Sequence, residues 1–230
     1  MPSPFSPSSS SLSERLRAQA DHQWRRATEH PMTDALADGT VPPEAMTVYL
    51  IEDHKFLDAF VVLVASVIAH APSLKDRIPA AQFLGMVTSR ENTFFERSFE
   101  ALKVPQERRD KAASPTSQAF IDLMLDAAKS QNLHEMLSVL LVAEWSYLTW
   151  AERVHPKRGQ KLPFWCSEWI DLHRGEGFEA FVGFLRELLD RVGESLTGKE
   201  MEACRERFNR AIELEGDFWD MAWGCLGGVA

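Results

Sequence analysis

Apolar residues recur at intervals of three and four in nearly every segment after residue 12. This period, close to 3.6, aligns them along one face of an α-helix, whereas a half-buried strand needs strict alternation of apolar and polar residues. Such alternation is nearly absent, and no longer internal repeat is visible. The sequence therefore predicts an all-α fold, which we expect to be a bundle of seven or eight helices.

Proline and capping residues mark where these helices begin and end. In the segment 37–46, turn residues are followed by Pro at a helix start, and Thr197 with Glu200 three residues later forms a predicted capping box. The charged segment 103–117 contains prolines and is interpreted as a surface link. The helices expected from the pattern span 11–30, 43–71, 73–102 (one or two helices), 114–130, 132–154, 164–174, 177–195 and 197–223.

Composition limits the class of protein. The 230 residues are 45% hydrophobic, enough for a sizeable core, and a net charge of −9 argues against a partner that is a nucleic acid. The longest apolar stretch, 59–69, is too short to span a membrane, and three cysteines without metal-ligand spacing favour a reduced, cytoplasmic protein. We expect one domain over 12–224, a disordered Pro/Ser-rich tail over 1–11 and a C-terminal tail over 225–230.

Three acidic residues occupy positions where helical spacing predicts the core. Asp53 lies on the apolar stripe of the helix at 43–71, Glu144 lies in the apolar run 140–152, and Glu215 lies on the stripe of the last helix. An ionised carboxylate in an apolar site costs several kcal/mol unless it is paired or protonated. These positions therefore need either a structural partner or a function.

Taken singly, each acid can be a buried carboxyl that bonds a Trp, an Arg or a helix end, or the edge of a stripe that reaches water. Three such acids on separate helices, each flanked by aromatic residues, instead indicate a pocket with aromatic walls and acidic contacts inside the bundle. A flat, nitrogen-rich cation or heteroaromatic ring fits such a pocket, because aromatic rings stack on its faces and carboxylates pair with its N–H and amino groups.

Histidines offer fewer candidates for chemistry. His173, in the sequence WIDLHRGEGF, follows an aromatic segment and precedes a Gly-containing turn, so a pocket-lining position is open to it. A di-iron site needs two Glu-x-x-His motifs on facing helices, but Glu152 and His155 supply this spacing only once. Nothing beyond His22 itself supports a haem ligand. We therefore expect no metal site.

Five sequence blocks, in order along the chain, resemble the TenA (thiaminase II) family. The resemblance covers residues 12 to 224 and implies a haem-oxygenase-like all-α fold that assembles as a homo-oligomer, a tetramer or a dimer. It also implies a protein that uses no cofactor, neither haem nor metal. The blocks are HPMTDALADGTVPPEAMTVYLIEDHKFL (30–57), SPTSQAF (114–120), LLVAEWSYL (140–148), WIDLHRGEGF (169–178) and ELEGDFWDMAW (213–223).

The resemblance also implies roles for particular residues. By position, Asp53 binds the edge of an aminopyrimidine, Phe56 is a pocket aromatic, and Phe120 and His173 stand where the family often has Tyr. Tyr147 is expected to position the reacting groups, and Glu215 to contact the ring and shuttle a proton. The predicted substrate-binding residues are thus Asp53, Phe56, Phe120, His173 and Trp219, and the predicted catalytic residues are Glu144, Glu215 and Tyr147.

One departure from the family pattern determines the expected chemistry. The larger class of the family has a nucleophilic Cys two residues before the Trp of the block at 140–148, but here that position is Ala143. The sequence resembles the second class, which lacks this Cys and is associated with a Glu nearby, and Glu144 is the candidate. One residue corresponds to about 100° of helix rotation, so the sequence does not place the Glu144 side chain at the point of the missing thiol.

Without a thiolate, covalent attack on the pyrimidine ring is not expected. We predict hydrolysis of thiamin-related aminopyrimidines, from the aminomethyl or formylaminomethyl compound to hydroxymethylpyrimidine, with weak or no thiamin cleavage. Asp53 would hold the ring, Glu215 would be a general acid toward it, and Glu144 would be the base for water or the acid for the leaving amine. Two alternatives are a non-catalytic thiamin- or pyrimidine-binding or regulatory protein, and an all-α oxygenase or carbon–carbon-bond enzyme of the same fold.

Overall fold

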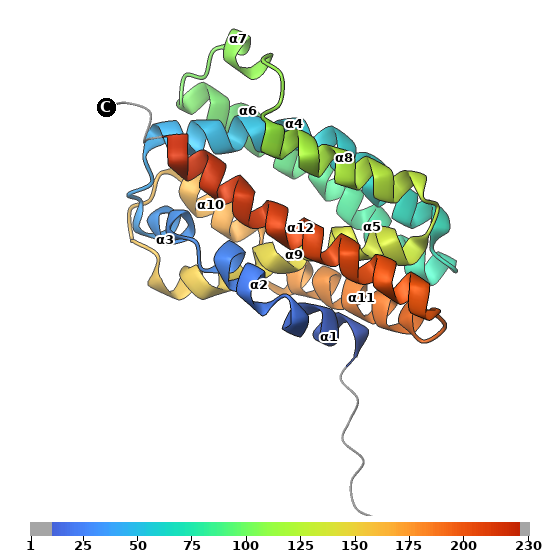
Figure 1. Cartoon of the computed structure of the whole chain (residues 1–230). Helices are drawn as coiled ribbons and strands as arrows, with labels where there is room; N and C mark the ends of the chain where they lie inside the picture. The colour runs from blue at the N-terminus through green and yellow to red at the C-terminus, as the bar shows by residue number, and fades with distance from the viewer. Residues whose placement is uncertain (1–10, 226–230) are drawn as a thin grey trace, which may run out of the picture.

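The computed structural model describes residues 11–225, and no residue in this range lies in a β-strand (Figure 1). The all-α prediction is therefore confirmed. The expectations for the two tails concern residues that, apart from Ser11 and Cys225, lie outside the described range. The helices are α1 (Leu12–Gln19), α2 (Asp21–Thr28), α3 (Pro31–Asp38), α4 (Pro43–His70), α5 (Leu74–Met86), η1 (Val87–Glu91), α6 (Asn92–Ala101), α7 (Gln106–Arg109), α8 (Pro115–Lys129), α9 (Leu133–Val154), η2 (His155–Lys157), α10 (Phe164–Leu172), α11 (Glu176–Gly193) and α12 (Gly198–Gly224).

The described residues form more helical segments than the seven or eight expected, because local breaks divide some of the predicted helices. The segment 11–30 bends at Ala20, which leaves helical geometry and separates α1 from α2. The segment between 31 and 42 contains a helix of its own, α3, which Gly39 ends with a φ of 71° that suits glycine. The surface link contains the four-residue α7. The predicted capping box at Thr197 and Glu200 is present at the start of α12.

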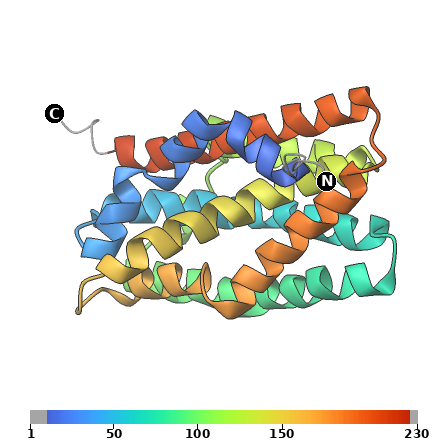
Figure 2. The same ribbon diagram turned by 90° about the horizontal axis from the view of Figure 1, so that it is seen from below.

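Helix α9 is the central helix of the bundle. It packs against α12, α11 and α4, and Figure 2 shows it between α12 on one side and α5 and α6 on the other. Every residue from Met136 to Glu144 is buried, whatever face of the helix it occupies. A helix that is apolar all round belongs in a core. The sequence run that contains Glu144 thus passes through the middle of the molecule.

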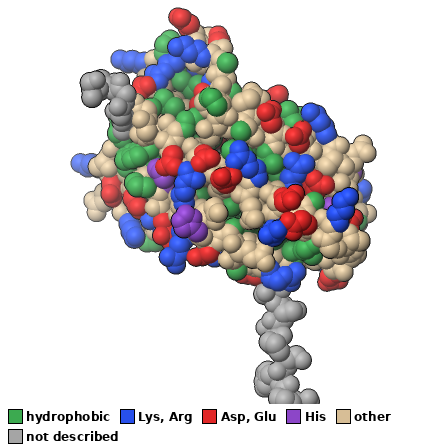
Figure 3. Space-filling view, viewed as in Figure 1, with side chains coloured by type: hydrophobic (Ala, Val, Ile, Leu, Met, Phe, Trp, Pro, Cys, Tyr) green, Lys and Arg blue, Asp and Glu red, His purple; other side chains and the backbone are tan. Residues whose placement is uncertain are grey.

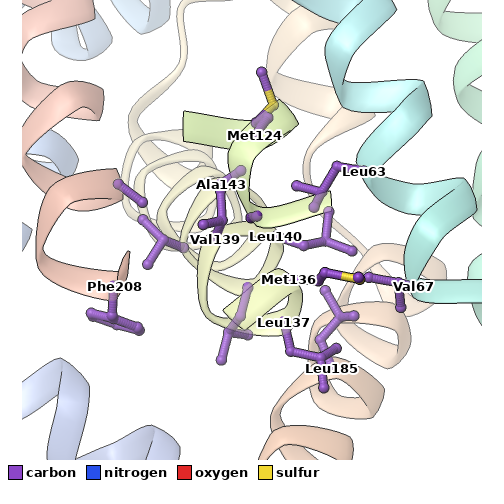
Figure 4. Close-up of a cluster of buried hydrophobic side chains, with 14 of the residues drawn as sticks. Leu63, Val67, Met124, Met136, Leu137, Val139, Leu140, Ala143, Leu185 and Phe208 are labelled. Carbon is purple, nitrogen blue, oxygen red and sulfur yellow. The ribbon is translucent and has the colours of Figure 1, made fainter. Parts of the chain in front are cut away.

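Two clusters of buried side chains make up the core. The first surrounds the N-terminal half of α9 and includes Leu63, Met136, Leu140 and Phe208 (Figure 4). The second surrounds the C-terminal half of α9 and is built on aromatic residues, which include Tyr49, Phe94, Trp150, Trp169 and Trp219. Leu57 and Tyr147 pack against both clusters. The junction between the clusters is the part of the core that acquires polar groups.

The face of the molecule shown in Figure 3 carries side chains of both charge signs. In the face shown in Figure 3, Lys and Arg side chains alternate with Asp and Glu side chains. Among residues 11–225, no helix has the length and apolar composition that crossing a membrane requires.

Candidate functional site

A small cavity lies at the junction of the two core clusters. Helices α4 and α9 form two of its walls, the π-helical turn η1 contributes one residue, and α10 with the residue after it closes the remaining side. The lining combines carboxyl groups with aromatic and small apolar side chains. The lining residues are Asp53, Phe56, Leu57, Phe60, Glu91, Ala143, Glu144, Tyr147, Trp169 and His173.

Three carboxyl groups face this cavity. Asp53 is 4% exposed, Glu144 is 7% exposed and Glu91 is 9% exposed, and none of them makes a hydrogen bond or an ion pair with another described residue. Buried polar groups are normally bonded within the protein, so unpaired carboxyls around one cavity are an exception that needs a reason. Carboxyl groups that form their hydrogen bonds with a bound ligand or with water in the cavity would explain the exception.

Burial changes the protonation of these acids. It raises the pKa of Asp53 and of Glu144 well above the ordinary range, and it raises the pKa of Glu91 to about 7. Repulsion adds to the effect, since Glu91 raises the pKa of both Asp53 and Glu144. Like charges that share a site cannot all ionise, and the acids are therefore mixed in their protonation near neutral pH.

Tyr147 is held by a second tyrosine. The hydroxyl groups of Tyr147 and Tyr49 form a hydrogen bond. The rings of both tyrosines stack against Trp219, at centroid distances of 4.7 Å for Tyr49 and 5.9 Å for Tyr147. Burial raises the pKa of both hydroxyls well above 10, so both remain protonated. The pair presents a fixed, neutral hydroxyl at the cavity wall.

His173 is a neutral cavity residue with a defined tautomer. Its Nδ1 lies 2.8 Å from the Trp169 carbonyl oxygen and donates to it, because the carbonyl can only accept. Burial lowers the pKa of the imidazole to about 4. The Nε2 atom is therefore an acceptor at neutral pH, and no Lys or Arg is among the lining residues.

Five of the eight predicted site residues line the cavity, and three lie behind its walls. Phe120 on α8 packs its ring against Phe56 at 5.4 Å, edge to face, and Trp219 on α12 lies behind the two tyrosines. Glu215 on α12 is 3% exposed, and its Oε1 has no hydrogen-bond partner among the described residues. Burial raises the pKa of Glu215 well above its ordinary range, and repulsion by Asp53 adds to this. These three residues support the lining residues in this structure rather than facing the cavity.

The sequence reasoning missed Glu91. A signal was present, because Glu91 follows Val87 by four residues and precedes Phe95 by four, which places it on an apolar helical stripe like the other acids. The structure adds what spacing does not show. Val87–Glu91 is a π-helix inserted between α5 and α6, and such turns occur frequently at functional sites.

The position at which the larger class of the family has its nucleophilic Cys faces the cavity. Ala143 is a lining residue, directly before Glu144 on α9. None of the three cysteines, Cys166, Cys204 and Cys225, lines the cavity, and burial raises the pKa of Cys166 to about 12. The carboxyl groups are thus the groups with acid–base capacity at this wall.

The described residues contain no group of three or more His, Cys, Asp and Glu side chains placed to hold a metal ion. Glu152 and His155, which have the Glu-x-x-His spacing, make other contacts. Glu152 accepts a hydrogen bond from the Gly175 backbone N–H at 3.4 Å and forms an ion pair with Arg174, while His155 begins η2.

The cavity acids predict that the protein becomes less stable as the pH rises. Between its ordinary pKa of 4.5 and its folded pKa of about 7, Glu91 holds a proton in the folded state that the unfolded state has lost. The free energy of unfolding therefore falls through this window, by about 3 kcal/mol from Glu91 alone. Urea unfolding at about pH 5 and pH 8 measures the difference, and E91Q should reduce it. An equal difference in E91Q and the wild type would contradict the assignment.

Known proteins and solved structures are similar to this chain over nearly its whole length. A protein of Bacillus subtilis (strain 168) named aminopyrimidine aminohydrolase is 25% identical over 214 residues, which cover 92% of this chain and 89% of that protein. A TenA homologue from Pyrococcus furiosus superposes with a TM-score of 0.83 at 22% identity, covering 92% of this chain and 99% of that chain. A Shewanella denitrificans domain with a haem-oxygenase-like fold superposes with a TM-score of 0.67 at 13% identity, covering 94% and 93%, so the expected fold is confirmed. The family model described as TENA/THI-4/PQQC matches residues 17–224, and this chain therefore belongs to the TENA/THI-4/PQQC family.

Proposed function

We propose that this protein hydrolyses thiamin-related aminopyrimidines, converting an aminomethyl- or formylaminomethyl-pyrimidine to the hydroxymethyl compound, as a step of thiamin salvage. The observation that carries the proposal is the cavity in which three unpaired carboxyl groups face aromatic walls. The name of the Bacillus subtilis relative, aminopyrimidine aminohydrolase, supports the same reaction class.

The cavity suits a flat ring with amino groups. Phe56, Phe60 and Trp169 offer ring faces and edges, and Tyr147 adds a hydroxyl. Asp53 lies one turn from Phe56 on α4, so a ring that packs against Phe56 can present its amino edge to Asp53. A protonated carboxyl can donate to a ring nitrogen and accept from the neighbouring amino group at the same time. We assign Asp53 to this contact.

Proton transfer to and from the ring involves a second acid. Glu215 is not among the lining residues, but it lies close enough to Asp53 for the charge of Asp53 to raise its pKa. We propose that Glu215 acts on the ring through Asp53, by keeping Asp53 supplied with a proton that it can pass to the ring nitrogen. A direct contact of Glu215 with the ring, which the family resemblance implies, stays a prediction.

Ala143 argues for hydrolysis by water instead of covalent catalysis. A side chain with one carbon leaves space beside Glu144, and no thiol reaches this wall. Thiamin carries a bulky thiazolium leaving group, and its cleavage in the absence of a thiolate nucleophile is expected to be weak or absent. A small leaving group, ammonia or formamide, needs less room in the cavity than a thiazole ring does.

Product analysis tests the proposal. The purified protein is incubated with the aminomethylpyrimidine or with thiamin, and hydroxymethylpyrimidine, ammonia and thiazole are quantified. We expect hydroxymethylpyrimidine and ammonia in equal amounts from the first substrate and little or no thiazole from the second. Binding of the aminopyrimidine without any product would favour a non-catalytic binding or regulatory protein, and loss of activity on dialysis against a chelator would favour a metal-dependent enzyme of the same fold.

We also propose a cytoplasmic homo-oligomer, a dimer or a tetramer. Three free cysteines support a reducing compartment, and three large apolar side chains exposed on α4 and α5, Val62, Leu74 and Ile78, support a contact between copies. Light scattering of the purified chain measures the mass of the assembly.

A further inference from the structure

Glu91 owes its place in the cavity to a local change of helix type. Helices α5 and α6 would be continuous without η1, in which Val87–Glu91 forms π-helical rather than α-helical bonds. A π-turn widens the helix and shifts the residues after it, and it forms at a cost in hydrogen-bond geometry. Here its last residue is a glutamate, buried and facing the cavity, with no bonded partner among the described residues.

The titratable groups that line the cavity with Glu91 are two acids, a neutral tyrosine hydroxyl and a neutral imidazole. Asp53 faces it from α4, Glu144 and Tyr147 face the same cavity from α9, and His173 follows α10. Glu215 is more distant on α12, and His54 on α4 packs against Phe95 and Phe99 instead of lining the cavity. No Lys or Arg within residues 11–225 forms an ion pair with Glu91. A structural carboxyl would be paired, as Glu52 on α4 is with Lys55 and the Ser114 N–H.

We propose that Glu91 is the general base and Glu144 the general acid of the hydrolysis, with the scissile carbon–nitrogen bond held between them. This inference rests on the proposed function and makes it more specific, since Glu144 alone left the two roles undivided. The two carboxyls come from different elements, η1 and α9, and both line the one cavity, so water and the departing amine can each meet a carboxyl of its own.

Protons and bonds balance in a single step. Water loses a proton to the Glu91 carboxylate while its oxygen forms a bond with the methylene carbon of the substrate. The bond from that carbon to the amine nitrogen breaks, its electron pair goes to nitrogen, and Glu144 gives its proton to the nitrogen, which leaves as ammonia. Glu91 ends protonated and Glu144 ends ionised, and a proton passing from one to the other restores the starting state.

The assignment of base and acid follows from their surroundings. The acidity of Glu91 is weakened by burial alone, whereas that of Glu144 is weakened by burial and by repulsion from Glu91, Glu215 and Asp53. Glu91 is therefore the first of the two carboxyls to lose its proton as the pH rises toward neutrality. Pairs of carboxyls with separated proton affinities are typical of acid–base catalysis.

Kinetics of matched variants test the roles. E91Q should lower kcat by two to four orders of magnitude with little change in KM, and the fall of kcat below about pH 7 should disappear from its residual activity. E91D keeps a carboxyl on a shorter side chain. Its kcat should be lower than that of the wild type and should still fall below about pH 7. E100Q removes an exposed carboxyl from α6, outside the cavity, and should behave as the wild type. Wild-type kcat and pH profile in a folded E91Q would overturn the inference.

A titration separates this inference from the proposed function. With glutamate labelled by ¹³C at Cδ, and signals assigned from E91Q and E144Q, the Glu91 signal should titrate near pH 7 and the Glu144 signal only at higher pH. E91Q should lower the pKa of Glu144, while E144Q should leave that of Glu91 nearly unchanged. This result with no ammonia release would overturn the hydrolysis but keep the division of protons, and ionisation of Glu144 before Glu91 would overturn the division itself.

Discussion

Replacing Glu144 with Gln is expected to lower kcat for the aminomethylpyrimidine by two to four orders of magnitude, the usual contribution of a general acid. The amide keeps the size of the side chain and cannot give a proton to the departing nitrogen. KM should change little, because the ring is held by Asp53 and the aromatic walls. Steady-state assays of ammonia release measure both constants.

Stability provides the control for E144Q. Burial keeps the Glu144 carboxyl protonated, and Gln is a neutral group of the same shape, so E144Q should melt at or above the temperature of the wild type. E152Q, on the same helix but outside the cavity, should retain nearly all activity. Undiminished hydrolysis by E144Q would remove Glu144 from the mechanism.

Removing the Asp53 carboxyl should have an effect of similar size on substrate binding. D53A leaves the amino edge of the ring without a partner in a buried site, and we expect kcat/KM to fall by a factor of about 10² to 10³, which corresponds to roughly 3–4 kcal/mol. Calorimetric titration with hydroxymethylpyrimidine should show a matching loss of affinity. An unchanged Kd would mean that Asp53 does not touch the ring.

D53N distinguishes hydrogen bonding from proton transfer. Its amide can reproduce both hydrogen bonds to an aminopyrimidine but cannot pass a proton to the ring. We therefore expect a Kd near that of the wild type together with a lowered kcat. E52Q is the matched control at the neighbouring position, where the carboxylate bonds Lys55 and Ser114 outside the cavity, and it should affect stability rather than kinetics.

Much of this architecture is predictable from the sequence because helix patterns are local. The bounds of α4, α8 and α9 differ from the expected ranges by at most one or two residues, since proline starts and apolar stripes define them. The break at Ala20 carries no such mark. Ala is the best helix former, and the bend there depends on how α1 and α2 pack against α11 and α12.

The acids were identifiable from the sequence, but their distances from the cavity were not. Spacing places Asp53, Glu144 and Glu215 on apolar stripes, and all three are buried. Which of these acids reaches the cavity depends on the side chains that lie between the acid and the cavity. Tyr49, Tyr147 and Trp219 form a stacked layer over part of α12, and Glu215 lies outside the lining.

Glu91 shows that the position of an acid on an apolar stripe does not by itself identify it as a cavity residue. Its spacing fits a regular α-helix, so the sequence carries no sign of the π-turn that ends at this residue. Such a turn is stable only where surrounding contacts fix it, here the packing of α5 and α6 on α4. The spacing of the sequence is enough to predict Glu91 as a fourth buried acid. Its position in the cavity is known only from the fold.

A structure of the protein with bound hydroxymethylpyrimidine tests the central claim most directly, because it shows which carboxyls touch the reaction product. We predict the amino edge of the ring within hydrogen-bond distance of Asp53, with the hydroxymethyl oxygen between the carboxyl groups of Glu91 and Glu144. A ring bound elsewhere, or one in this cavity whose hydroxymethyl group points away from both glutamates, would contradict the account.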